Sequence, residues 1–326
     1  MSVQQLPIHM TVQQVPINVA VHHVHVHVTV DEALCVIFAL LTAASNAVAA
    51  VLQRKAAAQV PPERSMHVSL IADLIRRRVW LAGIAMVVVA AVAQATALAF
   101  GPIALVQPIF IIELPLTLML SALVIRGRDA IRQLPWRAII ITTVALGAGL
   151  AAAQPSGAIN YARDSSWIIA LIATAAFEAV LIGAAVGTRG EPRAALLGLA
   201  AACGYALTAA LLKNAMADLN LGVVVFFTRW HIYAVAAAGV GSLFLLQNAL
   251  QAGSLVASQP MLTVGDALIS IAYGVTLFSE VLRDGWWLLP QFVALAAIIY
   301  GCVQIAKSPL AAEAVPLVAE APSTVQ

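Results

Sequence analysis

Nine long apolar stretches occupy most of this chain, and they limit its fold more than any other feature. A helix needs about 20 apolar residues to cross the roughly 30 Å hydrocarbon core of a bilayer. Runs of about that length lie at residues 34–57, 79–100, 102–125, 136–154, 166–187, 193–216, 229–250, 254–279 and 286–306. They are rich in Ala and Leu and lack the alternation of membrane strands, so each run predicts a helix. The expected fold is an all-α polytopic membrane protein with about nine transmembrane helices.

The composition excludes several other classes of protein. Hydrophobic residues make up 62% of the chain and charged residues 10%, whereas soluble domains are about 45–50% apolar and about 25% charged. A net charge of +2 does not fit a nucleic-acid partner. The three cysteines lie inside apolar runs and predict no disulfide framework. Zinc-protease, nucleophile-elbow and Walker A motifs are absent, so neither an enzyme nor a cofactor is expected.

Tryptophans and basic residues predict how the chain sits in the membrane. All six tryptophans fall near predicted helix starts, and indole rings favour the membrane–water interface. Of the 17 basic residues, four (Arg163, Lys213, Arg229 and Arg283) fall on one side and the other thirteen on the opposite side. The positive-inside rule therefore predicts a cell-membrane protein with its N-terminus outside and its C-terminus cytoplasmic. Residues 67–78 are too short and basic to span alone; a tenth helix that includes them stays open and would move the N-terminus inside.

The two ends of the chain differ in composition from the apolar spans. Residues 1–33 form a low-complexity extension rich in His, Val and Gln, and the Pro- and Ala-rich tail at 307–326 is predicted to be disordered. If the extension is a strand, His23, His25 and His27 share one face, where imidazoles can chelate Zn²⁺ or Ni²⁺. The simpler interpretation is a low-complexity extension without a metal.

Two parts of the chain carry the same sequence pattern. Residues 97–108 read ALAFGPIALVQP and residues 249–260 read ALQAGSLVASQP, sharing Ala, Leu, Gly, Gln and Pro at a constant offset. Residues 34–154 therefore correspond to residues 193–306, with a connecting helix at 166–187. The odd spacing of five spans reverses the second copy, which predicts two inverted four-to-five-helix repeats, as in many secondary transporters. A duplication retained only for packing is the alternative.

Each copy contains a Gln-Pro pair inside an apolar helix: Gln107-Pro108 and Gln259-Pro260. Proline leaves the carbonyl four residues earlier without its donor, and in lipid that carbonyl needs a neighbour, a water or a ligand. Broken helices at corresponding positions of two repeats are typical of transporter binding sites. We therefore predict that both helices break at these prolines and that the breaks face each other. Kinks used only for packing are the alternative.

Three acids lie near the centres of predicted spans: Glu113, Glu178 and Asp266. Each costs about 2.5–3.5 kcal/mol on insertion scales, so such residues commonly mark proton relays or ion sites. Hydrogen bonding between helices is the simpler alternative. Other polar residues expected to line the same cavity are Asn46, Gln94, Tyr205, Asn248 and Tyr273. His231 is expected at the interface, and Gly147, Gly149, Gly239 and Gly241 are expected to allow close helix approach.

The repeat, its Gln-Pro segments and the sequence FSEVLR at 278–283 resemble the drug/metabolite transporter (DMT) superfamily, in particular its EamA-like domains. Residues 80–108 are also similar to the NIPA-like magnesium-transporter branch. The resemblance covers about residues 34–306, and its usual layout is ten helices. It implies transport of a small solute by alternating access, often with proton exchange, and an acid after a Pro-containing helix. Glu280 holds that position in the second copy, whereas the first copy has Arg126-Gly127-Arg128.

Together these features predict a multi-pass secondary transporter, or permease, for a small solute or metabolite. Two alternatives stay open. One is a Mg²⁺ permease, in which the same carboxylates meet a hydrated cation. The other is a non-transporting membrane scaffold or accessory subunit, whose polar residues only hold helices together. The expected partners are a small-molecule or ion substrate and the lipid bilayer, and a homodimer is left open.

Overall fold

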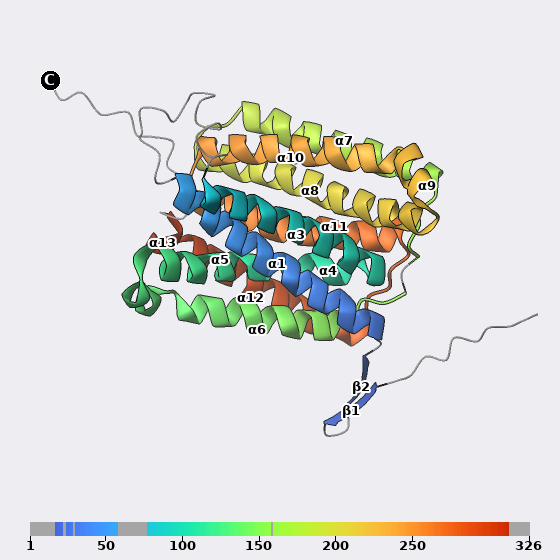
Figure 1. Ribbon diagram of the computed structural model, residues 1–326, viewed down its shortest axis with the longest axis horizontal. Helices are drawn as coiled ribbons and strands as arrows, with labels where there is room; N and C mark the ends of the chain where they lie inside the picture. The colour runs from blue at the N-terminus through green and yellow to red at the C-terminus, as the bar shows by residue number, and fades with distance from the viewer. Residues whose placement is uncertain (1–16, 22–23, 29, 58–76, 158, 313–326) are drawn as a thin grey trace, which may run out of the picture.

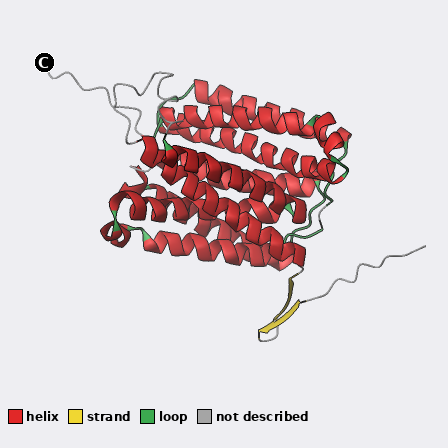
Figure 2. Ribbon diagram, viewed as in Figure 1, coloured by secondary structure: helices red, strands yellow, loops and turns green. Residues whose placement is uncertain are grey.

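A computed structural model describes residues 17–21, 24–28, 30–57, 77–157 and 159–312. In this part of the chain, nine helical segments are long and apolar enough to cross a membrane (Figures 1 and 2). The predicted class, an all-α polytopic membrane protein, is therefore confirmed. Of the segment considered for a tenth span, only Arg77 and Arg78 fall within the described residues.

The first four spans end at α6. They are α1 (Val30–Ala57), α3 (Arg78–Phe100), a composite third span, and α6 (Trp136–Ala153). The third span consists of α4 (Ile103–Ile109), the 3₁₀ turn η2 (Phe110–Ile112), α5 (Glu113–Ser121) and the π turn η3 (Ala122–Arg126). A further 3₁₀ segment, η4 (Arg128–Gln133), leads to α6.

The remaining five spans follow in order. They are α7 (Asp164–Val186), α8 (Glu191–Asn220), α10 (His231–Ala252), α11 (Leu255–Leu277) and α12 (Leu288–Ala306). Short helical segments lie between or after them: α9 (Val223–Thr228), η5 (Gly285–Trp287) and α13 (Pro309–Ala312). An antiparallel hairpin of β1 (Ile17–Val21) and β2 (Val24–Val28) precedes α1. We call the end of the bundle where α1 begins the hairpin end (Figure 1).

Helix α8 organises one half of the bundle. It packs along α10 and α11 and also contacts α7, while α1 packs along α3, and α6 along α12. Alanines fill the interior of α8, and Gly198 lets α11 approach so closely that an added Cβ would lie 2.8 Å from the carbonyl oxygen of Ser258. Small residues favour such close packing in membranes, where helices gain no hydrophobic drive toward one another.

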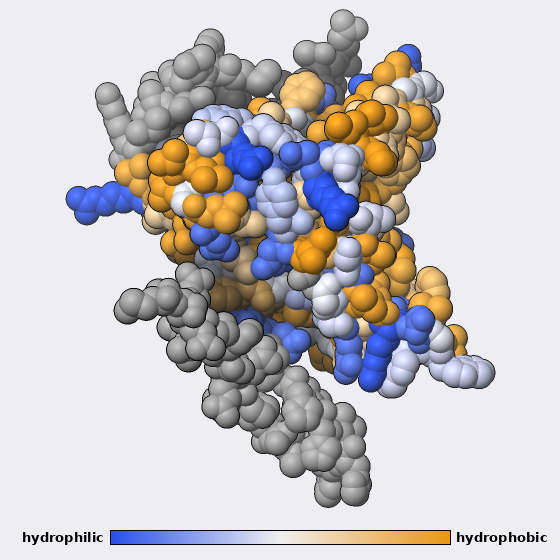
Figure 3. Space-filling model, turned by 90° about the vertical axis from the view of Figure 1, so that its right-hand side faces the viewer, coloured by the Kyte–Doolittle hydropathy of each residue, from blue (hydrophilic) through white to orange (hydrophobic). Residues whose placement is uncertain are grey.

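The outer faces of the bundle are strongly apolar. Ile172 of α7 is 65% exposed and Val240 of α10 is 70% exposed, although both helices belong to the membrane-spanning set. Seen from the hairpin end, hydrophilic residues run across the middle of the end face, between hydrophobic residues on either side (Figure 3). Large apolar surfaces flanking a polar end are what a bilayer-embedded bundle requires.

The ends of the chain depart in part from expectation. The tail predicted to be disordered from residue 307 instead continues the fold to Ala312, because Leu310 and Ala311 are buried against Leu134 and Ile139. Residues 313–326 lie outside the described residues. At the other end, His25 and His27 belong to β2, while His23 lies outside the described part, so the metal hypothesis stays untested.

Two residues expected near the membrane–water interface are buried in the protein. Trp167 lies in the first turn of α7, as expected, but its side chain is 1% exposed, because it packs edge-on against Trp230 and Phe278. The span predicted at 193–216 places Lys213 near its end, close to the interface, yet α8 extends to Asn220 and buries Lys213 about two turns inside the helix. One side of the membrane therefore keeps three basic loop residues instead of four.

Candidate carboxyl site

Glu113 is held at the point where the third span changes helix type. Pro108 lies in α4, the 3₁₀ turn η2 follows it, and Glu113 is the first residue of α5. Pro115, in the first turn of α5, cannot donate to the carbonyl of Ile111 in η2, which fits the local change in helix geometry. Asn46 of α1 donates a hydrogen bond from Nδ2 to Oε2 of Glu113 at 3.0 Å. The sequence-predicted acid and the predicted cavity residue Asn46 therefore meet directly.

Asp266 occupies the corresponding place on α11. Ser270, one turn later and fully buried, donates a hydrogen bond from its hydroxyl to Oδ1 of Asp266 at 3.4 Å. Asp266 lies within the electrostatic reach of Glu113, and Tyr205 of α8 lies within reach of both acids. The structure thus brings together four predicted residues from four helices: Asn46, Glu113, Tyr205 and Asp266.

The two carboxyls lie at nearly the same depth, whereas the two prolines do not. Helix α4 packs against α11, and Ile103 lies beside Gly274 near the hairpin end. Ile111 belongs to the same buried cluster as Val264 and Ala267. The third span and α11 run antiparallel, so later residues of the third span lie beside earlier residues of α11. Counting residues along both helices from these two contacts places Glu113 at about the same depth as Asp266.

The prediction that both helices break at their Gln-Pro pairs is wrong for the second copy. Helix α11 continues through Pro260 without interruption, while the third span changes to a 3₁₀ turn just after Pro108. The same residue count places Pro108 nearer to the hairpin end than the two carboxyls, and Pro260 nearer to the opposite end. The prolines therefore lie on either side of the carboxyl level, and the expected pair of facing breaks is not formed.

The glutamines differ as well. Gln107 is 2% exposed, and its side-chain nitrogen has no hydrogen-bond partner in the described part of the chain. A buried amide donor normally finds a partner, so an unsatisfied one in a candidate site is notable. Gln259 is only half-buried on α11.

The other predicted residues lie apart from the carboxyl pair. Glu178 of α7 is half-buried beside Gly204 and forms no hydrogen bond to a described residue. Tyr273 hydrogen-bonds Thr174 of α7. Asn248 bonds back to the carbonyl of Phe244 in its own helix, a local role. Gln94 is half-buried on α3 without a contact to either acid among the described interactions.

A buried ion pair near the hairpin end was not predicted from the sequence. Lys213 and Glu280 lie 3.8 Å apart, Nζ to Oε1, and neither side chain is exposed. Lys213 also donates to the carbonyl oxygen of Gly101 at 2.6 Å and lies 5.4 Å from the ring centroid of Phe278. The signal for Lys213 was present, since a lysine inside an apolar run requires a partner, but the predicted helix end at 216 placed it near the interface.

Glu280 itself caps the third span. Its Oε1 accepts the N–H of Ile103 at 2.7 Å and its Oε2 accepts the N–H of Ala104 at 2.8 Å, the first two residues of α4. Ser279 adopts a left-handed φ of 53°, so the chain turns back and the N–H of Glu280 reaches the carbonyl of Gly274 at 2.9 Å. Burial raises the pKa of Glu280, while the N–H donors and Lys213 act in the opposite direction.

A second buried polar cluster at the hairpin end surrounds His231. His231 is the first residue of α10, so its predicted place at the end of a span is confirmed, but its side chain is fully buried and the expected exposure at the interface is wrong. Its Nδ1 lies 2.7 Å from Oδ2 of Asp218, and Nδ2 of Asn214 lies 3.0 Å from its Nε2. Asn214 Oδ1 accepts the N–H of Ala162 at 2.7 Å, which fixes the amide with its NH₂ toward the imidazole. Nε2 must then accept, so this arrangement holds a neutral His231 that donates from Nδ1 to Asp218.

Comparison with known proteins adds little about activity. No protein-family profile and no solved structure matches the chain. It is similar to an uncharacterized protein of Corynebacterium glutamicum, 24% identical over 278 residues, which cover 84% of this chain and 95% of the relative. Similarity along nearly the whole of both chains fits a shared overall architecture and assigns no activity.

Proposed function

We propose that this protein is a cell-membrane secondary transporter that moves a small solute by alternating access, with Glu113 and Asp266 as its coupling carboxyls. One observation carries the proposal. Two acids that are 153 residues apart in sequence, on α5 and α11, lie at a similar mid-span depth and close enough for Glu113 to act electrostatically on Asp266. In the described part of the chain, neither of them forms an ion pair with lysine or arginine. Carboxyls held at this depth need a proton or a cation to balance their charge.

The neighbours of the two acids support a site that can load and release a proton or a cationic group. Asn46 and Ser270 donate hydrogen bonds to the carboxyls, and Tyr205 adds a hydroxyl within electrostatic reach of both. None of these groups carries a fixed positive charge that would hold the acids permanently ionised. The unpartnered amide nitrogen of Gln107, buried in α4 of the same span, is available as a donor to a solute.

The packing of the helices supports the inverted repeat on which alternating access would depend. In the first half α1 packs along α3 and against α5; in the second half α8 packs along α10 and against α11. Helix α7 stands between the two sets in the sequence, as a connecting helix would. Repeats related in this way give two similar packings that open to opposite sides of the membrane. The resemblance to the DMT superfamily also implies a twofold repeat, although its usual layout has ten helices.

We further propose that the hairpin end faces the outside and the opposite end the cytoplasm. After the reassignment of Lys213, the loops of the hairpin end contain Arg163, Arg229 and Arg283, against thirteen basic residues toward the other side. The positive-inside rule assigns the richer side to the cytoplasm.

The test is solute transport by purified protein in liposomes. A thermal-shift screen of metabolites and divalent ions first selects ligands that stabilise the folded protein. Flux of the selected solute is then measured with and without a pH gradient. Glu113→Gln and Asp266→Asn should each reduce proton-driven flux by about tenfold or more, because a neutral amide cannot exchange a proton. Asp284→Asn, an exposed acid outside the spans, is the matched control.

The same experiment decides between the alternatives. Undiminished flux in both amide variants would remove the carboxyls from the mechanism. Magnesium uptake without need of a pH gradient would favour the Mg²⁺ permease; the described residues contain no group of three acidic, His or Cys side chains placed to hold a metal, so the ion would keep most of its water. A scaffold would tolerate Leu at Glu113, Glu178 and Asp266 with no loss of phenotype.

A further inference from the structure

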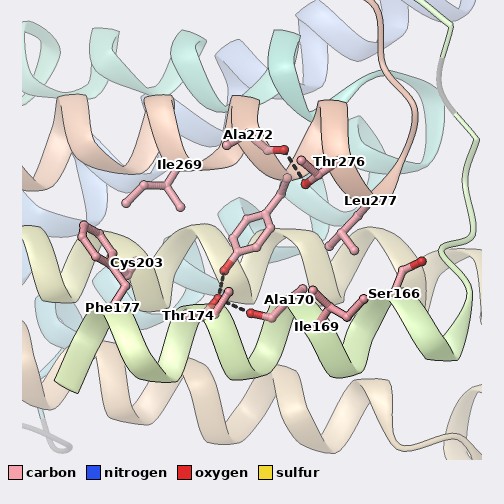
Figure 4. A pocket seen from close by; sticks show the side chains of 12 residues that line it. Ser166, Ile169, Ala170, Thr174, Phe177, Cys203, Ile269, Ala272, Thr276 and Leu277 are labelled. Carbon is pink, nitrogen blue, oxygen red and sulfur yellow. Dashed lines mark hydrogen bonds between the residues drawn. The ribbon is translucent and has the colours of Figure 1, made fainter. Parts of the chain in front are cut away.

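A groove on the membrane-facing side of the bundle lies between α7 and α11. Its volume is about 470 Å³, within the range of roughly 300–1,000 Å³ typical of small-ligand sites. The groove exists because α7 packs along α8 and contacts α11 only sparingly. Figure 4 shows the side chains that line it. Cys203 of α8 and Tyr273 of α11 are lining residues that are buried and form its floor.

The walls of the groove are apolar and open sideways. Ile169, which is 72% exposed, and Phe177, which is 47% exposed, line it from α7. Ala272 and Thr276 line it from α11 and are exposed as well. Because these flanking residues lie at membrane depth, the open side of the groove faces acyl chains rather than water.

The length and position of the groove match one leaflet of a bilayer. It begins at Ser166, in the first turn of α7, beside Leu277 at the end of α11, and it ends near Phe177 and Ile269 at mid-span. The 11 helical steps from Ser166 to Phe177, at about 1.5 Å each, rise about 16 Å, roughly half of a 30 Å hydrocarbon core. A groove that starts at the interface and stops at the centre has the reach of one acyl chain.

Polar groups lie at the interfacial end of the groove and at its floor. Arg163 is exposed at the N-cap of α7, one turn before Ser166, whose hydroxyl lines the groove. At the floor, the hydroxyls of Thr174 and Tyr273 bond to each other and so present no unsatisfied group to an apolar occupant.

We propose that this groove binds one acyl chain of an anionic phospholipid from the leaflet at the hairpin end. The lipid phosphate lies near Arg163 and Ser166, and the chain runs along α7 to Phe177. This inference does not depend on the transport function, because neither Glu113 nor Asp266 lines the groove.

The experiment uses the full-length protein in nanodiscs containing phosphatidylglycerol with a photoreactive diazirine in one acyl chain. After illumination, mass spectrometry should locate cross-links in residues 166–177 and 269–277 in preference to other exposed helix faces. Ala173→Trp fills the groove from α7 and should lower the groove cross-links by roughly fivefold or more, because the space for the chain is lost. Ala175→Trp, on the same helix but outside the groove, is the matched control and should leave them unchanged.

Two additional variants keep the test independent of any single substitution. Thr276→Trp fills the groove from α11 and should repeat the effect of Ala173→Trp if that variant folds poorly. Arg163→Gln should reduce cross-linking by phosphatidylglycerol toward the level given by phosphatidylcholine, because it removes a cation near the phosphate. Cross-links spread evenly over all exposed helices, or groove cross-links unaffected by both Trp variants, would overturn the proposal. So would a protein–protein cross-link across α7 that replaced the lipid adducts.

Discussion

The carboxylate of Glu280, in the loop after α11, accepts the backbone N–H of Ile103 at the start of α4, 177 residues earlier in the chain, at a distance of 2.7 Å. The next N–H, of Ala104, and the ammonium of Lys213 complete its surroundings. Three segments from different parts of the bundle therefore meet at one buried carboxyl. Gly274 leaves the space for it, since a Cβ there would overlap Oε2 of Glu280.

Replacing Glu280 by Ala should destabilise the fold strongly. The change leaves the Lys213 ammonium and two N–H groups buried without their partner, and breaking one side of a buried pair typically costs about 3–5 kcal/mol. Thermal unfolding in detergent micelles measures the effect. Glu191 is the matched control, because its carboxylate bonds Ser254 just before α11 in an exposed setting. If Glu191→Ala is as damaging as Glu280→Ala, burial of the pair is not the cause.

The stability contributed by Glu280 should depend on pH. Burial raises its pKa in the folded protein, so the folded state holds this proton more tightly than the unfolded chain. Its contribution is therefore greatest below the ordinary pKa of a glutamate and falls as pH rises through the raised value. Glu280→Gln removes the titration, so the difference in unfolding midpoint between wild type and this variant should shrink from about pH 4 to pH 8. A difference that is constant over this range would contradict the raised pKa.

Asn46 and Glu113 should be energetically coupled. Their side chains share a hydrogen bond of 3.0 Å between α1 and α5. In a double-mutant cycle, Asn46→Ala and Glu113→Ala should show an interaction energy of about 1 kcal/mol in unfolding measurements. Gln94 on α3 is the control partner, and Gln94→Ala with Glu113→Ala should be additive. Additive behaviour of Asn46 as well would mean that the contact contributes nothing in the membrane-protein fold.

His231→Ala should destabilise the hairpin end. The substitution deprives Asp218 of its bond at 2.7 Å while one oxygen of that carboxyl, Oδ1, already has no partner within the described residues. Leaving a buried charged group unsatisfied typically costs about 3 kcal/mol. Tyr233→Phe, which removes an exposed hydroxyl from the same helix, is the control and should change the melting temperature little. Equal effects of the two changes would argue against a structural role of the His231 cluster.

Replacement by alanine should lower the stability of the fold at Gly198 but not at Gly147, because the two glycines have different surroundings. At Gly198 a Cβ would lie 2.8 Å from the backbone oxygen of Ser258, so Gly198→Ala should push α8 and α11 apart and lower stability by about 1–3 kcal/mol. Gly147 on α6 has nothing within 4 Å of an added Cβ. Gly147→Ala should be neutral or stabilising, because alanine favours the helix by about 1 kcal/mol. Unfolding midpoints of both variants check the pair.

The spans were predicted well from the sequence because the bilayer requires each crossing helix to be long and apolar, and both properties follow directly from the order of residues along the chain. Length and hydropathy alone locate helices such as α3, whose observed bounds Arg78–Phe100 lie close to the predicted 79–100. The error at α8 shows where this rule ends. Polar residues at the end of α8 lowered its apparent hydropathy, yet Lys213 and Asp218 are buried by partners from distant segments. The hydropathy along the chain gives no information about those partners, because they come from segments far away in the sequence.

The glycines give a similar lesson. Gly147, Gly149, Gly239 and Gly241 were expected to mark close helix contacts, but only Gly149 has a neighbour as near as 3.0 Å to an added Cβ. The tightest contacts instead involve other glycines, among them Gly101, Gly204, Gly274 and Gly301. Glycine is common in membrane helices, and which glycine meets a neighbour depends on helix rotation, which composition does not specify.

By itself the sequence determined that the chain forms an α-helical membrane bundle, and it identified Glu113, Asp266 and Asn46 as unusual polar residues, because lipid penalises each polar group whatever the packing. Only the tertiary structure decided that the two acids lie together, that the two prolines lie apart, and that Glu280 joins Lys213 to the start of α4. Depth in the membrane follows from position along a helix. Contact between helices follows from how side chains of distant segments fit, and that information is distributed over the whole chain.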